Sequence, residues 1–338
     1  MMSPKQQATK LQTLIDRSKS RAPIRVAVVN AAQDVVLQTL HQAVSIGFVE
    51  PILIGDPKLI ENLARKAGLS NAAQHVIEAK TDATGASLGV ALVRDGKADV
   101  LMKGLIHTDV FLRAILDSDR GLRLPGRRVS HAFLCDIPAY EKLLIVTDAA
   151  INIAPDLNAK AQILQNAIEL CHLLEIATPK VAVLSAIETV NPEIPSTLDA
   201  AALTLMARRG QIYGAIVDGP LAFDNAISLA AATEKGITSD VAGESDILLV
   251  PDLVAGNILA KNLEHLAGAV AAGVVLGLSV PVILSSRSDP AAGRLAALAL
   301  AALMHEQMPK TPPKKAVPME RTLEAAPQPE SACCPPPS

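Results

Sequence analysis

The side chains most able to bind a ligand or take part in a reaction in this 338-residue chain lie at residues 285–289, which read SSRSD. The apolar run Val280–Leu284 precedes it and an Ala- and Leu-rich stretch, 290–303, follows it. We therefore expect the segment to join a buried strand to a helix. Open α/β sheets bind ligands where their strands end, and hydroxyls, a guanidinium and the N–H groups of a helix start bind anions. The segment predicts a phosphate site.

Three basic side chains after a second apolar run are also candidate anion ligands: Lys103, His107 and Arg113. The structural alternative is an ordinary helix start that Thr108 or Asp109 caps. Both interpretations stay open on these residues alone.

Polar side chains follow further apolar runs. Asp148 and Asp218 would each either orient a ligand or close a turn. Asp252 comes after another run, and Asn257 and Lys261, four residues apart, share one face of a predicted helix near its start. We expect the last three to line a binding site, with a solvated helix face as the alternative.

The elements that must position these side chains alternate along the chain. Apolar runs that predict strands are 24–29, 51–54, 76–78, 100–102, 143–147, 181–184, 215–217, 247–250 and 280–284. Helical spacing of apolar residues lies between them, for example at 34–45, 57–67, 161–174 and 198–209. This alternation favours the α/β class, with mainly parallel sheets covered by helices.

The chain is expected to form two α/β domains with a cleft between them. Pro155 marks a crossing between the domains, and Asp156 or Asn158 can cap the next helix. The first domain then comprises 1–152 and 285–307, the inserted second domain comprises 153–284, and a Pro-rich tail, 308–338, is expected to be disordered.

One segment has the length and composition of a membrane span. Residues 266–286 contain no charged side chain, but glycines and Pro281 interrupt them, and proline removes a backbone donor from a helix. We expect instead a buried helix, a turn and the strand 280–284 in a soluble protein.

Composition and missing motifs exclude several functions. A net charge of −3 favours neither nucleic acid nor an anionic membrane as partner. The four Cys lack metal-ligand spacing and no HExxH is present, so no metal site is predicted. No GxGxxG follows the first strand, and GxxxxGK[ST] and GxSxG are absent. The polar start lacks a signal core, and reduced thiols fit a cytoplasmic protein.

Long strings of the sequence resemble the phosphate acetyltransferase/phosphate butyryltransferase family, in the family's order. They span about residues 20–305 and read LMKGLIHTDVFLRAIL, RRVSHAFLCDIPAY, LLIVTDAAINIAPDL, SAIETVNPEIPSTLDAAAL, IVDGPLAFDNAIS, DVAGESDILLVPDLVAGNILAK and VPVILSSRSD. The likeness is greatest to the acetyltransferase that is often fused behind an enoyl-CoA hydratase domain, and only the transferase part is expected here.

The resemblance implies two α/β domains about a deep cleft, similar to isocitrate and isopropylmalate dehydrogenases, and a homodimer. It implies reversible transfer of an acetyl group between CoA and inorganic phosphate through a ternary complex, without an acyl-enzyme. CoA, acetyl-CoA and phosphate are then substrates, with no tightly bound cofactor and no metal.

By matching position, the family's Ser-Arg pair falls on Ser286 and Arg287. These residues would hold the phosphate and the developing oxyanion. Further substrate-binding positions within the matched strings are Lys103, His107, Arg113, Ser130, Asp148, Asp218, Asp252, Asn257 and Lys261.

The chain departs from some family members at the general base. There, an Asp that deprotonates the CoA thiol follows the Ser-Arg pair by about two helical turns; here Gly293 lies in that region. The nearby carboxylate is Asp289, and either it acts as the base from a different angle or another group does. The SRSD pattern is closer to the butyryl-type branch.

Three alternatives to acetyl transfer remain open. A phosphate butyryltransferase would prefer longer acyl-CoA. An NAD- and metal-dependent dehydrogenase of the same fold would need clustered carboxylates or histidines. A non-catalytic protein that binds acyl-CoA or acyl phosphate and regulates a partner would fit a lost base.

Overall fold

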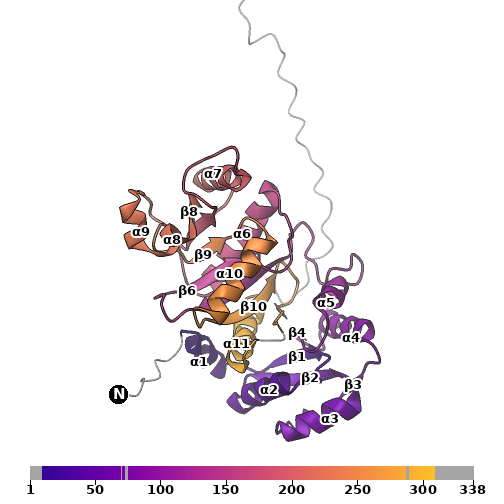
Figure 1. Cartoon of the computed structure of the whole chain (residues 1–338). Helices are drawn as coiled ribbons and strands as arrows, with labels where there is room; N and C mark the ends of the chain where they lie inside the picture. Colours follow the sequence, from indigo (N-terminus) through magenta and orange to yellow (C-terminus); the bar gives the residue numbers. More distant parts are fainter. Residues whose placement is uncertain (1–9, 70, 73–74, 287–288, 309–338) are drawn as a thin grey trace, which may run out of the picture. The chain divides into compact units, whose positions relative to one another are not determined.

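The computed structural model describes residues 10–69, 71–72, 75–286 and 289–308. Its strands are β1 (Ile24–Val29), β2 (Val49–Gly55), β3 (Ile77–Glu78), β4 (Val100–Lys103), β5 (Ser130–Asp136), β6 (Leu143–Thr147), β7 (Lys180–Leu184), β8 (Ile216–Leu221), β9 (Ile247–Leu249), β10 (Val270–Leu276) and β11 (Val282–Ile283). Its helices are α1 (Gln12–Lys19), α2 (Asp34–Ile46), α3 (Pro57–Lys66), α4 (Asp82–Arg94), α5 (Thr108–Ile115), α6 (Leu157–Leu173), α7 (Pro195–Arg208), α8 (Phe223–Ile227), α9 (Leu229–Glu234), α10 (Leu253–His265) and α11 (Ala291–Gln307) (Figure 1).

These strands form one mixed sheet in the order β3-β2-β1-β4-β11-β10-β5-β6-β9-β7-β8. Neighbours at both ends of this order are parallel, as the alternation of strands and helices predicts. The pairs β11–β10, β10–β5 and β5–β6 at the centre are antiparallel. The sheet is therefore mostly parallel, and its strand direction reverses in the middle.

That reversal brings the ends of two distant strands to one level of the sheet. The last residue of β11, Ile283, pairs with Val274, which pairs with Ala132, and Ala132 pairs with Thr147, the last residue of β6. Since β11 and β6 run in opposite directions, the segments after them start in the same row of residues. Leu284 and Asp148, the residues that follow these two strands, thus both lie at the centre of the sheet.

Helices cover both faces of the sheet. Successive side chains of a strand point to opposite faces, so the apolar strands present side chains for helices to bury on each face. In β1, Val26 and Val28 pack with residues of α1, α2 and α11, whereas Ala27 and Val29 pack with residues of α4 and α5. Farther along the sheet, a separate apolar cluster contains residues of α8, α9 and α10. The apolar clusters that contain α5 and α10 thus lie on the other face of the sheet from the cluster that contains α11.

Two strands correct the sequence prediction. Residues 266–279 were expected to form a buried helix and a turn, but half of them form β10, which pairs with a neighbour on either side. The strand β5 was not expected at all. Both are buried along nearly their whole length, so neither has the polar and apolar alternation that marks a half-buried strand.

The described residues belong to a single unit that extends to Met308. The division into domains 1–152 with 285–307 and 153–284, and the cleft between them, stay predictions from the sequence. The predicted tail lies outside the described residues except for Met308. Among the described helices, none is long and apolar enough to cross a membrane.

Candidate active site

The turn between β4 and α5 forms one wall of a polar pocket. Gly104 permits this turn, because a Cβ at that position would lie 2.3 Å from the Asn30 carbonyl oxygen. Helix α5 begins at Thr108 with His107 as its N-cap, so neither Thr108 nor Asp109 caps it as the structural alternative supposed. The pocket has a volume of about 310 Å³ and is lined by Lys103, Ile106, His107, Thr108 and Ser286.

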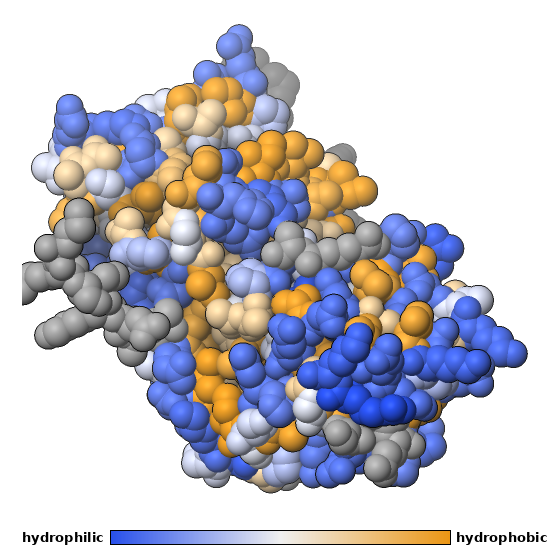
Figure 2. Space-filling model, turned by 60° about the horizontal axis from the view of Figure 1, so that its bottom comes forward, coloured by the Kyte–Doolittle hydropathy of each residue, from blue (hydrophilic) through white to orange (hydrophobic). Residues whose placement is uncertain are grey.

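A second, more apolar pocket of about 430 Å³ lies beside it. Its apolar lining includes Phe133 from β5, Leu284, and Leu253, Val254 and Ile258 from α10. Val254 and Ile258 are 64% and 56% exposed, so this wall is open to a ligand as it stands. Large apolar side chains also reach the surface elsewhere, and the face drawn in Figure 2 mixes apolar and hydrophilic areas.

Thr108 and Ser286 line both pockets. A ligand with an anionic end and an apolar end can therefore lie across this border, with the anion near Lys103 and the apolar part against α10. Lys103 is only 3% exposed, which strengthens its field at short range because little water screens it. This arrangement suits a phosphate group joined to, or adjacent to, an apolar acyl group.

The segment after β11 holds Ser286 at this border. The backbone N–H of Ser286 donates to Asp289 Oδ2 at 2.7 Å, and the N–H of Asp289 donates to the Ser286 carbonyl at 3.3 Å. Lys103 Nζ makes a long contact of 3.5 Å with the Ser285 carbonyl. Arg287, the predicted phosphate ligand, lies outside the described residues.

Asp289 is a buried carboxylate, 5% exposed, directly behind Ser286. Its Oδ1 atom has no hydrogen-bond partner among the described residues. Burial raises the pKa of Asp289, the Ser286 N–H lowers it and the charge of Glu264 raises it. Asp289 does not line either pocket, so its carboxylate would have to accept a proton from behind the Ser286 backbone.

Asp148, the candidate after β6, organises the opposite wall. Its Oδ1 accepts the N–H groups of Ala150 and Ile151 at 2.9 and 3.0 Å. Its Oδ2 accepts the Asn152 amide at 2.6 Å and the His131 N–H at 3.2 Å. Asp148 is 3% exposed and closes a turn, the structural alternative for this residue, and the turn places Ala149 and Ala150 in the apolar pocket.

Helix α10 contributes the third group of candidates. Asp252 is its N-cap and accepts the Ala255 N–H at 2.9 Å. Asn257 and Lys261 both line the apolar pocket, which confirms that they share one face. Asn257 Nδ2 donates to the Ala149 carbonyl at 3.3 Å, and Lys261 pairs with Glu264 at 3.1 Å.

Like Asp148, Asp252 and Asp289, three further predicted positions line neither pocket. Arg113 lies exposed in the last turn of α5. Ser130 is fully buried at the start of β5, where its Oγ accepts Asn166 Nδ2 at 2.9 Å. Asp218 lies within β8 at the end of the sheet order, and not in a turn after a strand.

The sequence interpretation missed several residues around the pockets. Arg294, 1% exposed, donates to the segment 285–289, and Glu264 lies next to Lys261. The buried ring of His131 packs edge-on against Phe133, with ring centroids 4.4 Å apart. Only Arg294 had a signal in the sequence, since a lone arginine interrupts the apolar stretch 290–303.

No group of three or more metal-binding side chains occurs within the part of the chain that the structure describes. The residues of the two pockets are hydroxyl, ammonium, imidazole and amide groups with apolar neighbours, and they bind anions and apolar groups better than cations.

Comparison with known proteins points to the same chemistry. Residues 79–302 match the family model described as "Phosphate acetyl/butaryl transferase". A phosphate acetyltransferase of Rhizobium meliloti is 46% identical over 297 residues, which cover 88% of this chain and 94% of that protein. A phosphate butyryltransferase of Clostridium acetobutylicum is 40% identical over 86% of this chain and 96% of its own length. The crystal structure of a branched-chain phosphotransacylase from Enterococcus faecalis V583 superposes with a TM-score of 0.72 at 32% identity, covering 83% of this chain and 99% of that one.

Proposed function

This chain belongs to the phosphate acetyl/butyryl transferase family, and we propose that it transfers an acyl group reversibly between CoA and inorganic phosphate. The observation that supports this most is the pair of pockets that meet at Thr108 and Ser286. The polar pocket suits the phosphate, and the apolar pocket suits the acyl group and the thiol-bearing end of CoA. The substrates are then small molecules, and no tightly bound cofactor takes part.

In the direction that forms acyl-CoA, the CoA thiol loses its proton to a carboxylate. The thiolate attacks the acyl carbonyl, the bond between the carbonyl carbon and the phosphate oxygen breaks, and inorganic phosphate leaves. Lys103 and His107 would hold the phosphate, and Ser286 would donate to the oxyanion that forms on the carbonyl. Arg287 keeps its predicted place as the bidentate phosphate ligand.

We infer that Asp289 is the base. Its carboxylate has a free oxygen among the described contacts, and burial raises its pKa toward the range in which a base can both accept and release a proton. Asp252 caps α10 and would act on the site through Asn257 and Lys261. The substrate-binding roles of Arg113, Ser130 and Asp218 stay predictions from the sequence.

We propose acetyl as the preferred acyl group. The acetyltransferase relative is 46% identical and the butyryltransferase relative 40%. Acetyl and butyryl differ by two methylenes, each of which contributes only about 1–3 kcal/mol of discrimination. A homodimer and a cytoplasmic location also remain proposals; light scattering on the purified protein tests the first.

The decisive experiment mixes the protein with CoA and acetyl phosphate and follows the thioester absorbance. We expect acetyl-CoA and an equal amount of inorganic phosphate, with butyryl phosphate reacting more slowly. Tight CoA binding without turnover would instead indicate a non-catalytic binder. Thermal stabilisation by NAD with Mg²⁺, and not by CoA, would indicate a dehydrogenase.

A further inference from the structure

Arg294 is a fully buried charged residue at the start of a long apolar helix. It lies in the first turns of α11, and its side chain is 1% exposed. Side chains of a helix tilt toward its N-terminus, so the guanidinium reaches back over the segment that precedes the helix.

The guanidinium contacts that segment at three separate points. Nη1 donates to Ser285 Oγ at 2.8 Å, and Nη2 donates to the Ser286 carbonyl at 2.6 Å. Nε donates to the Asp289 carbonyl at 3.2 Å. One rigid fork therefore contacts Ser285, Ser286 and Asp289 together.

Electrostatics oppose an arginine at this position. The N-terminus of a helix has a partial positive charge, and burial removes the water that would solvate the guanidinium. Burial accordingly lowers the pKa of Arg294, which the charge of Asp289 offsets in part. An apolar side chain would pack among the neighbouring leucines and alanines of α11 without this penalty. The benefit of arginine here lies in the segment that it holds.

We propose that Arg294 is a positioning residue of the reaction, which fixes Ser285, Ser286 and Asp289 so that Ser286 stays at the border between the two pockets. This inference rests on the proposed phosphate acyltransferase function. Arg294 acts through Ser286 and Asp289 and not by contact with substrate, since it lines neither pocket. Its positive charge also favours the ionised form of Asp289.

The charged groups around Asp289 set the direction of the pH effect. Glu264 on α10 raises the pKa of Asp289, while Arg294 on α11 and Lys261 on α10 lower it. Removal of the charge of Arg294 should therefore raise the pKa of Asp289 and move the acidic limb of the pH–rate profile to higher pH. A purely structural loss would lower the rate at all pH values and leave the limb in place.

The experiment compares Arg294→Met with Arg294→Lys in the full-length protein. Methionine removes the charge and keeps the bulk, so we expect kcat to fall on the order of 100-fold through the displaced Ser286, with an alkaline shift of the acidic limb. Lysine keeps the charge, but its three N–H donors lie on one nitrogen and cannot reach the three acceptors that Nε, Nη1 and Nη2 of the planar guanidinium contact. It should lower kcat and leave the limb where it is. Leu298→Met, also fully buried on α11, is the matched packing control and should change neither quantity.

The outcomes separate this inference from the proposed function. A wild-type protein that forms no acyl-CoA overturns the proposed function itself. An active wild type whose Arg294→Met variant keeps both kcat and the acidic limb overturns the role of Arg294. If Arg294→Met does not fold by circular dichroism, Arg294→Lys decides: a kcat lowered at an unchanged Tm and an unchanged KM supports the inference, and wild-type kinetics overturn it.

Discussion

Asp289 is the residue on which catalysis and stability should oppose each other. Asp289→Asn can still accept the Ser286 N–H, which the carboxylate accepts at 2.7 Å, but it cannot take a proton from a thiol. We expect kcat to fall by about 10²–10⁴, the usual contribution of a general base. Steady-state kinetics with CoA and acetyl phosphate measure this. Wild-type turnover in the variant would mean that the base is another group.

The same variant should be more stable than the wild type at neutral pH. Because the folded state raises the pKa of Asp289, the stability linked to its protonation is present below the unfolded pKa of about 3.9 and is lost as the pH rises through the folded pKa. Asparagine stays neutral throughout. The gain in Tm should therefore be larger at about pH 8 than at about pH 4.

His131 predicts a pH effect of opposite sign. Burial lowers its pKa and the charge of Asp148 partly opposes this, so the folded state disfavours the protonated ring. The stability linked to the neutral ring is present above the unfolded pKa of about 6.5 and is lost as the pH falls through the folded pKa. His131→Phe should lose less Tm than the wild type between about pH 7 and pH 5. The exposed His41→Phe should follow the wild type; an equal slope in all three would exclude His131 as the cause.

Among single residues, the sequence predicted polar side chains at strand ends as candidates for a binding site, and their binding roles stay predictions. Ser286, Lys103, Asn257 and Lys261 all line a pocket. It could not tell Asp148 and Asp252, which bind backbone N–H groups, from carboxylates free to bind a ligand. The hydrogen bonds that a carboxylate makes in the fold decide whether it is free to bind a ligand, and the spacing of residues along the sequence does not show them.

At the scale of elements, Gly256 sets how closely α10 approaches the opposite wall of the apolar pocket. A Cβ there would lie 2.7 Å from Val250 Cγ2 and 2.9 Å from the Asp148 carbonyl oxygen, so alanine must displace the helix. We expect Gly256→Ala to raise KM for CoA severalfold and to lower stability by about 1–3 kcal/mol. Steady-state kinetics and urea denaturation measure the two effects.

Gly85→Ala in α4 is the matched control. Its Cβ would meet its nearest neighbours at 3.5 Å, an ordinary contact. A helical Gly→Ala change without a clash stabilises by up to about 1 kcal/mol, so this variant should keep its KM and gain up to that much stability. A normal KM for Gly256→Ala would show that the position of α10 does not limit CoA binding.

Elements on the parallel parts of the sheet were predictable because helices separate their strands. Helix α6 begins after Asp156, whose side chain accepts the Ala159 N–H as the capping prediction required. The antiparallel centre was missed because β10 lies between two strands and is buried on both faces. A continuous apolar run of that kind does not distinguish strand from helix.

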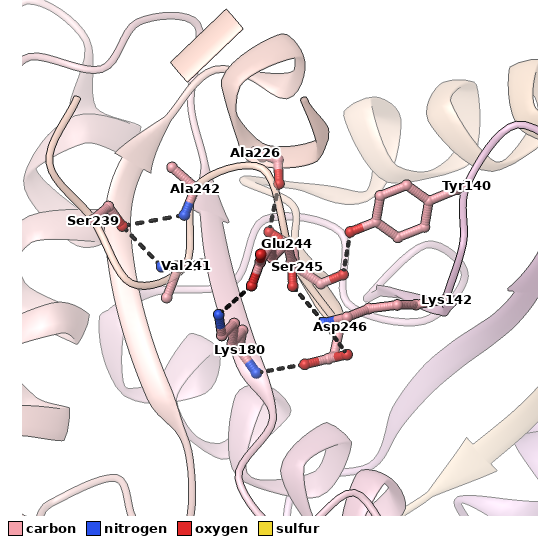
Figure 3. Close-up of polar contacts among 10 residues, drawn as sticks. All are labelled: Tyr140, Lys142, Lys180, Ala226, Ser239, Val241, Ala242, Glu244, Ser245 and Asp246. Carbon is pink, nitrogen blue, oxygen red and sulfur yellow. Dashed lines mark hydrogen bonds and ion pairs between the residues drawn. The ribbon is translucent and has the colours of Figure 1, made fainter. Parts of the chain in front are cut away.

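At the scale of the whole molecule, a polar network far from the pockets stabilises the sheet where β6, β7 and β9 meet. Figure 3 shows Asp246 at its centre, with Oδ1 accepting Lys142 Nζ at 2.7 Å and Oδ2 accepting the Lys180 N–H at 2.8 Å. The Tyr140 hydroxyl donates to the neighbouring Ser245 carbonyl at 2.6 Å. This network holds the chain in register just before β9 enters the sheet.

Asp246→Ala should therefore lower the free energy of unfolding by about 1–3 kcal/mol, since it leaves the partly buried backbone N–H of Lys180 without its acceptor. The kcat and KM values should stay as in the wild type, because neither pocket contains a residue of this network. Asp16→Ala, which breaks an exposed ion pair with Lys19 and an exposed hydrogen bond from Gln12, is the control and should change stability by less than about 0.5 kcal/mol. Equal losses in both variants would contradict the structural weight given to Asp246.

The common border of the two pockets also bears on inhibitor design. A single compound with a phosphonate at one end and a thioether-linked alkyl tail at the other would span Thr108 and Ser286 and fill both spaces at once. Once its first half is bound, the second half binds from a high effective concentration, so the joined molecule should bind far more tightly than its two fragments added separately.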